Sequence, residues 1–151
     1  YQKADLDLNP NLNRSGKKRG QDFMAYEHII DSYAWVEYFK GSEQGELARD
    51  FIEGKNSATS SITIAELSEK YEREGKKFEE DFNFIISQTK IINLNSEIAL
   101  LSGKLNFENK KKIKNWGMAD AIILATAQIN KSKVVTGDEH FRNFDSVMIN
   151  D

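Results

Sequence analysis

The chain has 151 residues, of which 39% are hydrophobic and 30% charged, and its net charge is −3. This length fits one globular domain, the composition excludes a wholly disordered chain, and no apolar run approaches the ~20 residues needed to cross a membrane. Cysteine is absent, which excludes disulfides and thiolate metal sites and fits a cytoplasmic protein, and we expect no membrane association.

Residues 1–23 show almost no apolar periodicity, contain the only proline and carry a small basic cluster at residues 17–19. This composition indicates an N-terminal extension outside the core, whether vector-derived or an upstream addition. Met24 is a plausible native start. We therefore expect one folded domain over residues 24–151.

From residue 26 the chain takes on the patterns of regular structure. A short apolar segment that ends in Asp31 predicts a buried strand, and the aromatic residues after it predict a helix that stops at Gly41. The apolar face within residues 47–52 predicts a second helix. Gly54 ends this helix, at a position where a left-handed residue often closes one.

The remaining segments continue the alternation of strands and helices. Their patterns predict, in chain order, a strand at 57–60, a helix from Ser60 or Ser61 to Gly75, a helix over 78–86, a strand at 90–95, a helix capped by Asn95 or Ser96, a helix over 118–129, and strands at 133–138 and 146–150. Strands separated by helices pair in parallel through right-handed crossovers. The sequence thus predicts an α/β fold with helices on both faces of a parallel sheet.

A run of lysines lies just before the most apolar helix and comprises Lys110, Lys111, Lys112 and Lys114. Such a cluster can bind the phosphate backbone of a nucleic acid, because backbone contacts supply most non-specific affinity. A solvated loop is the alternative interpretation, and the sequence leaves both open.

Four acidic residues, far apart in sequence, are expected at one edge of the sheet. They are Asp31 at the end of the first strand, Glu66 early in the helix after the second strand, Asp120 in the first turn of the helix before the fourth strand, and Asp138 directly after that strand. In parallel sheets, ligands bind beyond the carboxyl ends of the strands. Clustered carboxylates repel one another, and a divalent cation removes that penalty. With two histidines and no cysteine, the ligands would be oxygen atoms, which favours Mg²⁺ or Mn²⁺.

Each of these acids also has a purely structural interpretation. Asp31 and Asp138 could cap the helices that follow them, and Asp120 would interact favourably with its helix dipole. Glu66 could close a capping box with Thr63. Only a shared cation accounts for all four acids at once.

Four segments, IIDSYAWVEYF, SSITIAEL, GMADAIILATA and VVTGDEHF, resemble the motif blocks of PIN-domain ribonucleases, in particular the VapC-type toxins of prokaryotic toxin–antitoxin pairs. The resemblance covers nearly all of residues 27–149, in the family's order and spacing. It implies a three-layer α/β/α sandwich around a five-stranded parallel sheet, and an endoribonuclease that depends on Mg²⁺ or Mn²⁺. It also implies a toxin that is restrained by a small antitoxin protein and forms a homodimer.

The resemblance places the family's four acidic positions at Asp31, Glu66, Asp120 and Asp138, with supporting hydroxyl groups at Thr136 and Ser32. The three aspartates would be the closest metal ligands, and Glu66 would act through water or orient the nucleophile. Attack by hydroxide would leave a 5′-phosphate and a 3′-hydroxyl. His140 stands where the family often has a further acid, which favours one metal ion over two.

Two other functions stay open on the sequence alone. One is a binding module that recognises a partner without cleaving nucleic acid. It would be either a PIN-like domain that binds metal poorly or a receiver-like domain. The chain ends without the lysine that follows the last strand of a receiver, which counts against that version. The other is a PIN nuclease that acts on DNA or in ribosomal RNA processing.

Overall fold

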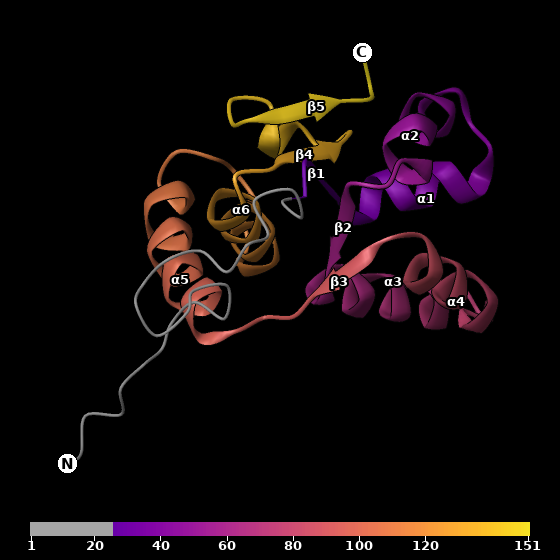
Figure 1. The fold of residues 1–151 in the computed structure, drawn as a ribbon. Coiled ribbons are helices and arrows are strands. Elements are labelled where there is room, and N and C mark those ends of the chain that lie inside the picture. The colour runs from indigo at the N-terminus through magenta and orange to yellow at the C-terminus, as the bar shows by residue number, and fades with distance from the viewer. Residues whose placement is uncertain (1–25) are drawn as a thin grey trace, which may run out of the picture.

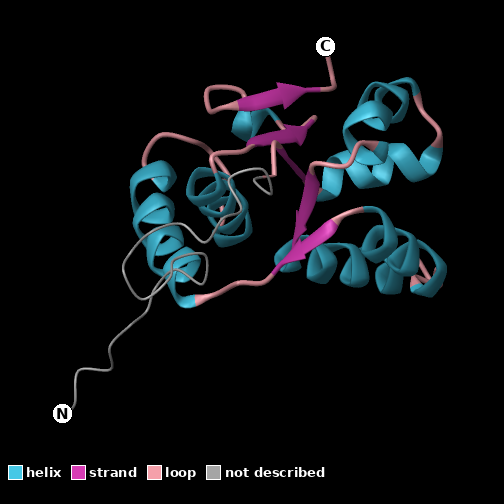
Figure 2. Ribbon diagram, viewed as in Figure 1, coloured by secondary structure: helices cyan, strands magenta, loops and turns pink. Residues whose placement is uncertain are grey.

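The computed structural model describes residues 26–151, and the extension expected over residues 1–23 lies outside them. Strands and helices alternate along the described chain (Figure 1, Figure 2). In order, the elements are β1 (His28–Ile30), α1 (Ser32–Lys40), α2 (Glu43–Glu53), β2 (Ser57–Ser60), α3 (Ser61–Arg73), α4 (Glu79–Gln88), β3 (Lys90–Ile92), α5 (Ser96–Lys110), α6 (Met118–Asn130), β4 (Lys133–Thr136), the 3-10 turn η2 (Glu139–Phe141) and β5 (Ser146–Met148). None of these helices combines the length and the apolar character that a membrane crossing requires.

The strands of the described chain form one five-stranded, all-parallel sheet in the order β3-β2-β1-β4-β5. Strand β1 pairs with β2 on one side and with β4 on the other, where Ile29 lies opposite Val134. In a receiver the third strand, not the fourth, pairs with the first, so the receiver-like alternative is wrong. The strand order reverses between β1 and β4, and ligands of such sheets bind beyond the carboxyl ends at the reversal.

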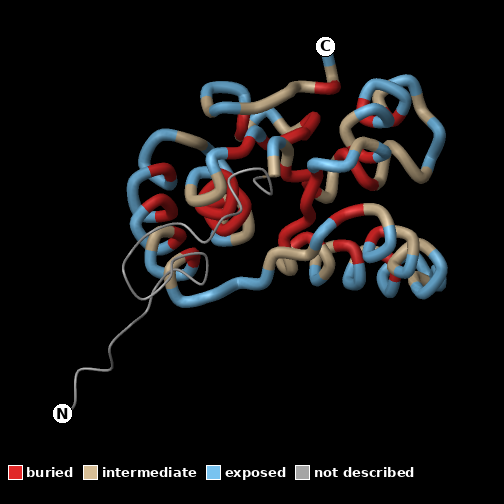
Figure 3. Tube along the Cα trace, in the orientation of Figure 1, coloured by how far each residue is buried: buried red, intermediate tan, exposed pale blue. Residues whose placement is uncertain are grey.

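Alternation of side chains along the central strands gives the sheet two apolar faces. Ile29 and Val134 belong to one core cluster, together with buried residues of α5 and α6. Ile30 and Val135, the next residues along the same strands, belong to a second cluster with residues of α1 to α4. The fold is therefore a three-layer α/β/α sandwich, as expected, and Figure 3 shows the buried residues along the strands and the inward helix faces.

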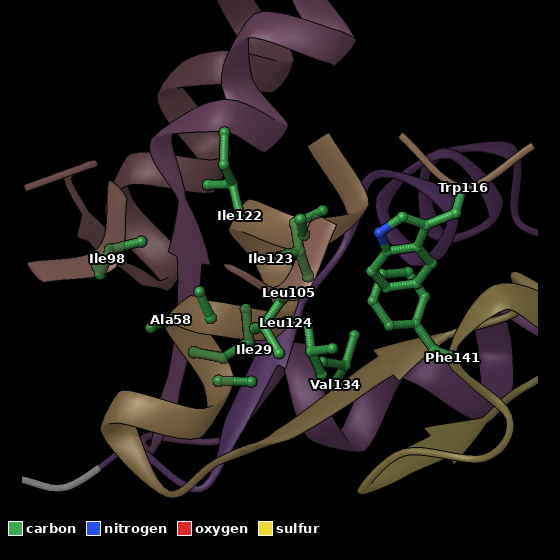
Figure 4. Packing of buried hydrophobic residues seen from close by; sticks show 13 residues of the cluster. Ile29, Ala58, Ile98, Leu105, Trp116, Ile122, Ile123, Leu124, Val134 and Phe141 are labelled. Carbon is green, nitrogen blue, oxygen red and sulfur yellow. The ribbon is translucent and has the colours of Figure 1, made fainter. Parts of the chain in front are cut away.

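Helix α6 is buried on most sides because it packs against α5, β1 and β4. Every residue from Ala121 to Ala127 is buried, which confirms the interpretation of this segment as a core helix. Just before α6, Trp116 packs on Phe141 of η2, with ring centres 5.7 Å apart (Figure 4). This contact joins the start of α6 to the segment that follows β4, at the carboxyl edge of the sheet.

The helix ends follow mainly from local signals. Gly41 closes α1 in the left-handed conformation, with φ of 68°. The side chain of Asn95 caps α5 by accepting the amide of Ile98 at 2.9 Å. Gly54 differs, since its φ of −71° and ψ of 163° are extended, and the left-handed closure expected for α2 is wrong. Gly54 leads into a turn at residues 55–56, after which β2 begins at Ser57.

Candidate metal centre at the carboxyl edge of the sheet

Asp31 directly follows β1, beside the reversal in strand order. Its amide donates a hydrogen bond to the carbonyl of Val135 at 3.2 Å, so the pairing of β1 with β4 continues to this residue. Asp31 is 3% exposed, and Oδ1 accepts the amide of Ala34 at 3.0 Å while Oδ2 accepts the hydroxyl of Thr136. Burial raises the pKa of Asp31 to about 7, although both hydrogen bonds act to lower it. The expected helix cap is present, and it holds the carboxylate at the sheet edge.

Glu66 lies in the second turn of α3. Ser60 caps this helix, and the Thr63 hydroxyl and Glu66 Oε1 are both buried without a hydrogen-bond partner among the described residues. The capping box considered for this pair is therefore wrong. The pKa of Glu66 is raised to about 7, first by burial and then by the nearby Asp120 carboxylate, while the Ser32 hydroxyl acts in the opposite direction.

Asp120 lies in the first turn of α6, as expected. Its Oδ2 accepts the amide of Gly117 at 3.1 Å, which caps the helix, and lies 3.1 Å from Nδ1 of His140. The same Nδ1 lies 3.7 Å from Oδ1 of Asp138. Burial raises the pKa of Asp120, whereas the Gly117 amide and His140 lower it. His140 thus stands between two of the acids.

Asp138 follows β4 and begins η2. Its Oδ1 accepts the amide of His140 at 2.9 Å, which is the cap expected for this residue. Its own amide donates to the hydroxyl oxygen of Thr136 at 2.9 Å. Since the same hydroxyl donates to Asp31, Thr136 connects the acids that follow β1 and β4.

One cleft of about 430 Å³ collects these side chains. Its lining includes Asp31, Ser32, Glu66, Asp120 and Asp138. Asp120 and Asp138 of this lining form a tighter group with His140, which is not itself a lining residue, and one ligand atom from each of the three lies within 4.8 Å of the others. The donors are carboxylate oxygens and one imidazole nitrogen, a set that can hold a divalent cation.

Three cations that the sequence analysis missed line the same cleft, namely Lys40, Lys70 and Arg73. Lys70 and Arg73 follow Glu66 by four and seven residues on α3, so helical spacing alone could have placed them beside it. Each cation is paired with a glutamate: Lys40 with Glu37 at 3.5 Å, Lys70 with Glu74 at 2.9 Å and Arg73 with Glu69 at 3.3 Å. The cleft therefore contains carboxylates that can bind a metal ion, next to basic side chains that can bind a phosphate group.

The lysine run lies away from this lining. Lys110 ends α5, the other three lysines occupy the exposed connection to α6, and none of the four lines the cleft. Nζ of Lys111 lies 3.8 Å from the ring centre of Phe107, an exposed residue of α5. The run is thus a solvated basic surface, and its binding to RNA stays a prediction.

The protein is thus a parallel α/β/α sandwich whose acidic residues gather beyond β1 and β4. The chain belongs to the PIN domain family, whose model matches residues 28–147. The family resemblance noted in the sequence is thereby confirmed.

Several solved structures have a similar fold. A toxin–antitoxin complex from Klebsiella pneumoniae is 26% identical, with a TM-score of 0.67 over 82% of this chain and 98% of that chain. VapBC2 from Rickettsia felis, bound to a DNA fragment from its promoter, is 21% identical, with a TM-score of 0.60 over 80% of this chain and 95% of that one. VapBC-1 from nontypeable Haemophilus influenzae is 18% identical, with a TM-score of 0.62 over 82% and 98%. The last two likenesses show a shared fold alone. Curated proteins yield no significant match.

Proposed function

We propose that this protein is a VapC-type toxin that hydrolyses RNA phosphodiester bonds as a Mg²⁺- or Mn²⁺-dependent endoribonuclease. Membership of the PIN family supports a nuclease, and the likeness to the Klebsiella pneumoniae toxin–antitoxin complex supports the toxin type. The observation that carries the chemistry is the meeting in one cleft of four acids, which come from the ends of β1 and β4 and from α3 and α6.

The side chains of the cleft fit a divalent cation. Oε1 of Glu66 is buried without a hydrogen-bond partner among the described residues. The pKa values of Asp31, Glu66 and Asp120 are all raised, which means that burial disfavours their charged forms. A cation offsets this cost, and carboxylate oxygens are the ligands that Mg²⁺ and Mn²⁺ prefer.

We assign each acid a role in this centre. Asp31, Asp120 and Asp138 hold the ion, and Glu66 binds it through water or orients the attacking water. Thr136 positions Asp31 through its hydrogen bond, and Ser32 lies beside Glu66. When bound, a divalent cation lowers the pKa of water and stabilises charge on the attacked phosphate.

The reaction consumes one water molecule for each phosphodiester bond. The water oxygen becomes bonded to phosphorus, the bond to the ribose 3′-oxygen breaks, and that oxygen takes a proton. The products are a 5′-phosphate and a 3′-hydroxyl, and the RNA 2′-hydroxyl takes no part. The end groups of the product therefore distinguish this reaction from metal-free cleavage, which uses the 2′-hydroxyl and leaves a cyclic phosphate.

We propose that RNA is bound through its phosphate backbone. The exposed run of Lys110, Lys111, Lys112 and Lys114 supplies positive charge at the start of α6. Lys40, Lys70 and Arg73 supply it at the cleft itself. Contacts of this kind give affinity that depends little on sequence and strongly on salt.

We propose further that a cognate antitoxin restrains this toxin, and that the toxin forms a homodimer in the cytoplasm. The likeness to the Klebsiella pneumoniae toxin–antitoxin complex supports the antitoxin. Exposed apolar surface on α5, where Leu100 and Phe107 are 63% and 66% exposed, supports a protein contact. Light scattering of the protein, alone and with the antitoxin, measures both associations. A monomer that binds no antitoxin would contradict this part.

The enzyme itself is tested with purified protein and structured RNA, in Mn²⁺ or in EDTA. We expect cleavage in Mn²⁺ only, with 5′-phosphate ends, and at least ~100-fold slower cleavage by Asp120→Asn, since this change removes a proposed ligand charge. Asp50→Asn is the matched control, because Asp50 is exposed on α2 and absent from the cleft lining. Equal cleavage in EDTA, cyclic phosphate ends, or full activity of Asp120→Asn would overturn the proposal.

A further inference from the structure

The proposed function assigns no role to His140, which lies behind the cleft lining, against Asp120 and Asp138. Its Nδ1 lies 3.1 Å from Oδ2 of Asp120 and 3.7 Å from Oδ1 of Asp138. In the described chain these three residues form the only group of three or more side chains whose candidate ligand atoms come so close together. The histidine therefore occupies the space between two proposed metal ligands.

The imidazole ring is held in this position from two sides. The His140 amide donates to Oδ1 of Asp138, which fixes the backbone of η2. The ring lies 6.0 Å from the ring of Trp116, which is itself buried against Phe141 and Phe144. These contacts leave Nδ1 on the side that faces the acids.

The spacing of the three atoms suits ligands of one ion. Neighbouring ligands of an octahedral ion with bonds near 2.1 Å are about 3 Å apart, and opposite ones about 4.2 Å. The distance of 3.1 Å from Nδ1 to Asp120 matches neighbouring ligands, and the 3.7 Å to Asp138 lies between the two values. Asp31 differs, because both of its oxygens accept hydrogen bonds from the protein, whereas Asp120 and Asp138 each accept a backbone amide through one oxygen only. Asp120, Asp138 and His140 are therefore better placed than Asp31 to be the innermost ligands.

Imidazole nitrogen is a ligand for transition metals, whereas Mg²⁺ is held almost entirely by oxygen. We propose that Nδ1 of His140 coordinates the divalent cation together with Asp120 and Asp138, so that this centre is a mixed nitrogen–oxygen site that prefers Mn²⁺ to Mg²⁺. This inference rests on the proposed metal-dependent function and specifies which ion the site takes. Coordination requires the lone pair of Nδ1, so the ion replaces the hydrogen bond to Asp120, and the ring proton resides on Nε2.

The alternative is that His140 only orients Asp120 through a hydrogen bond. The two arrangements differ in one measurable property, because only a ligand nitrogen shares unpaired electron density with Mn²⁺. The chain has just two histidines, and the other, His28, lies on β1 and packs on Phe51 with ring centres 4.7 Å apart. Histidine nitrogen can therefore be assigned without ambiguity.

Pulsed electron paramagnetic resonance of the full chain loaded with Mn²⁺ tests the proposal directly. We expect a ¹⁴N coupling that changes to a ¹⁵N coupling when only histidine is labelled with ¹⁵N. The coupling should persist in His28→Asn and vanish in His140→Asp, which restores the acid that the family often has. The labelling experiment uses the wild-type chain, so it stands even if a variant fails to fold.

Titration calorimetry supplies the second readout. The ratio of Mn²⁺ affinity to Mg²⁺ affinity should fall by about tenfold or more in His140→Asp, within the range seen when residues around a metal site are changed. Mn²⁺ binding without histidine coupling would overturn this inference and leave the nuclease proposal intact. If neither Mn²⁺ nor Mg²⁺ binds the wild-type chain, both this inference and the metal-dependent function fail.

Discussion

The hydroxyl of Thr136 donates a hydrogen bond to Oδ2 of Asp31, a residue 105 positions earlier in the chain, and accepts one from the amide of Asp138. A single side chain thus ties the acid after β1 to the acid after β4. The parallel pairing of these two strands, in which Ile30 lies opposite Val135, brings Thr136 within reach of Asp31.

Replacing Thr136 with valine should therefore impair both stability and metal binding. The substitution keeps the shape of the side chain but leaves a buried carboxylate oxygen of Asp31 without its donor, which costs about 1–3 kcal/mol. It also removes a contact that lowers the pKa of Asp31, so the carboxyl group should be harder to ionise. We expect Mn²⁺ affinity to fall by about tenfold or more, as measured by calorimetry. Thr136→Ser, which keeps the hydroxyl, should restore most of it, and equal losses in both variants would argue against a role for the hydrogen bond.

The raised pKa values of Asp31 and Glu66, each about 7, predict how the stability of the metal-free protein depends on pH. Between their ordinary pKa values and about 7, the folded state retains protons that the unfolded chain has released. Folding therefore becomes less favourable as pH rises through this window, and the loss is complete above it. Calorimetry in EDTA should give a Tm lower at about pH 8 than at about pH 5 by on the order of 5 °C. A Tm that is higher at the alkaline pH would contradict the raised pKa values.

Asp31→Asn should stabilise the metal-free protein at alkaline pH while it abolishes function. The amide oxygen can still accept the Ala34 amide, and the Thr136 hydroxyl can accept from the new amide nitrogen. Because the variant has no charge to bury, we expect a gain of about 2 kcal/mol at pH ~8 and little gain at pH ~5. Denaturant unfolding at the two pH values measures this difference. A variant that is destabilised equally at both would show that the carboxylate is needed for packing alone.

Gly137 lies where a side chain would overlap the ring of Tyr33. An added Cβ meets three carbons of that ring, although the backbone of Gly137 is not in the left-handed region. Gly137→Ala should therefore cost about 1–3 kcal/mol through overpacking, and it should also displace Tyr33 from the cleft lining. The control is the double variant with Tyr33→Ala, in which the added methyl group has room. Additive effects of the two changes in a thermodynamic cycle would contradict the proposed clash.

RNA binding by the lysine run is tested by replacing Lys110, Lys111, Lys112 and Lys114 with alanine. The replacements are made in the Asp120→Asn variant, which is expected not to cleave the RNA. If these exposed lysines contact phosphates, RNA affinity should fall by about tenfold or more, and the slope of log K against log salt should decrease by up to ~3. Fluorescence anisotropy with a single-stranded RNA at several salt concentrations measures both. Lys131→Ala, at an exposed position after α6, is a control for loss of charge. An unchanged slope would assign backbone binding to the cations of the cleft instead.

Local chemistry explains why the sequence predicts the elements of this fold well. Apolar periodicity and capping side chains act within a few residues, and Asp31 and Asn95 cap α1 and α5 in the structure as such signals indicate. The parallel sheet follows from the alternation of strands and helices, because short strands joined through helices have few other ways to pair. Asp31, Asp120 and Asp138 could be selected because each lies at the end of an element, where packing alone does not require a charge, and Glu66 because it lies early in the helix after β2.

Local sequence patterns predicted the order of the elements, the α/β class and the set of candidate acids. These patterns do not show that β1 lies between β2 and β4, and therefore which acids share a cleft; the three-dimensional fold establishes both. It also decided that Glu66 makes no capping box, that Lys70 and Arg73 face the acids, and that Nδ1 of His140 stands between Asp120 and Asp138. The two kinds of interaction act over different separations along the chain. Caps and periodicity depend on neighbours in the chain. A metal centre depends on distances between residues that lie up to 107 positions apart in the sequence, as Asp31 and Asp138 do, and that sheet pairing and core packing bring together.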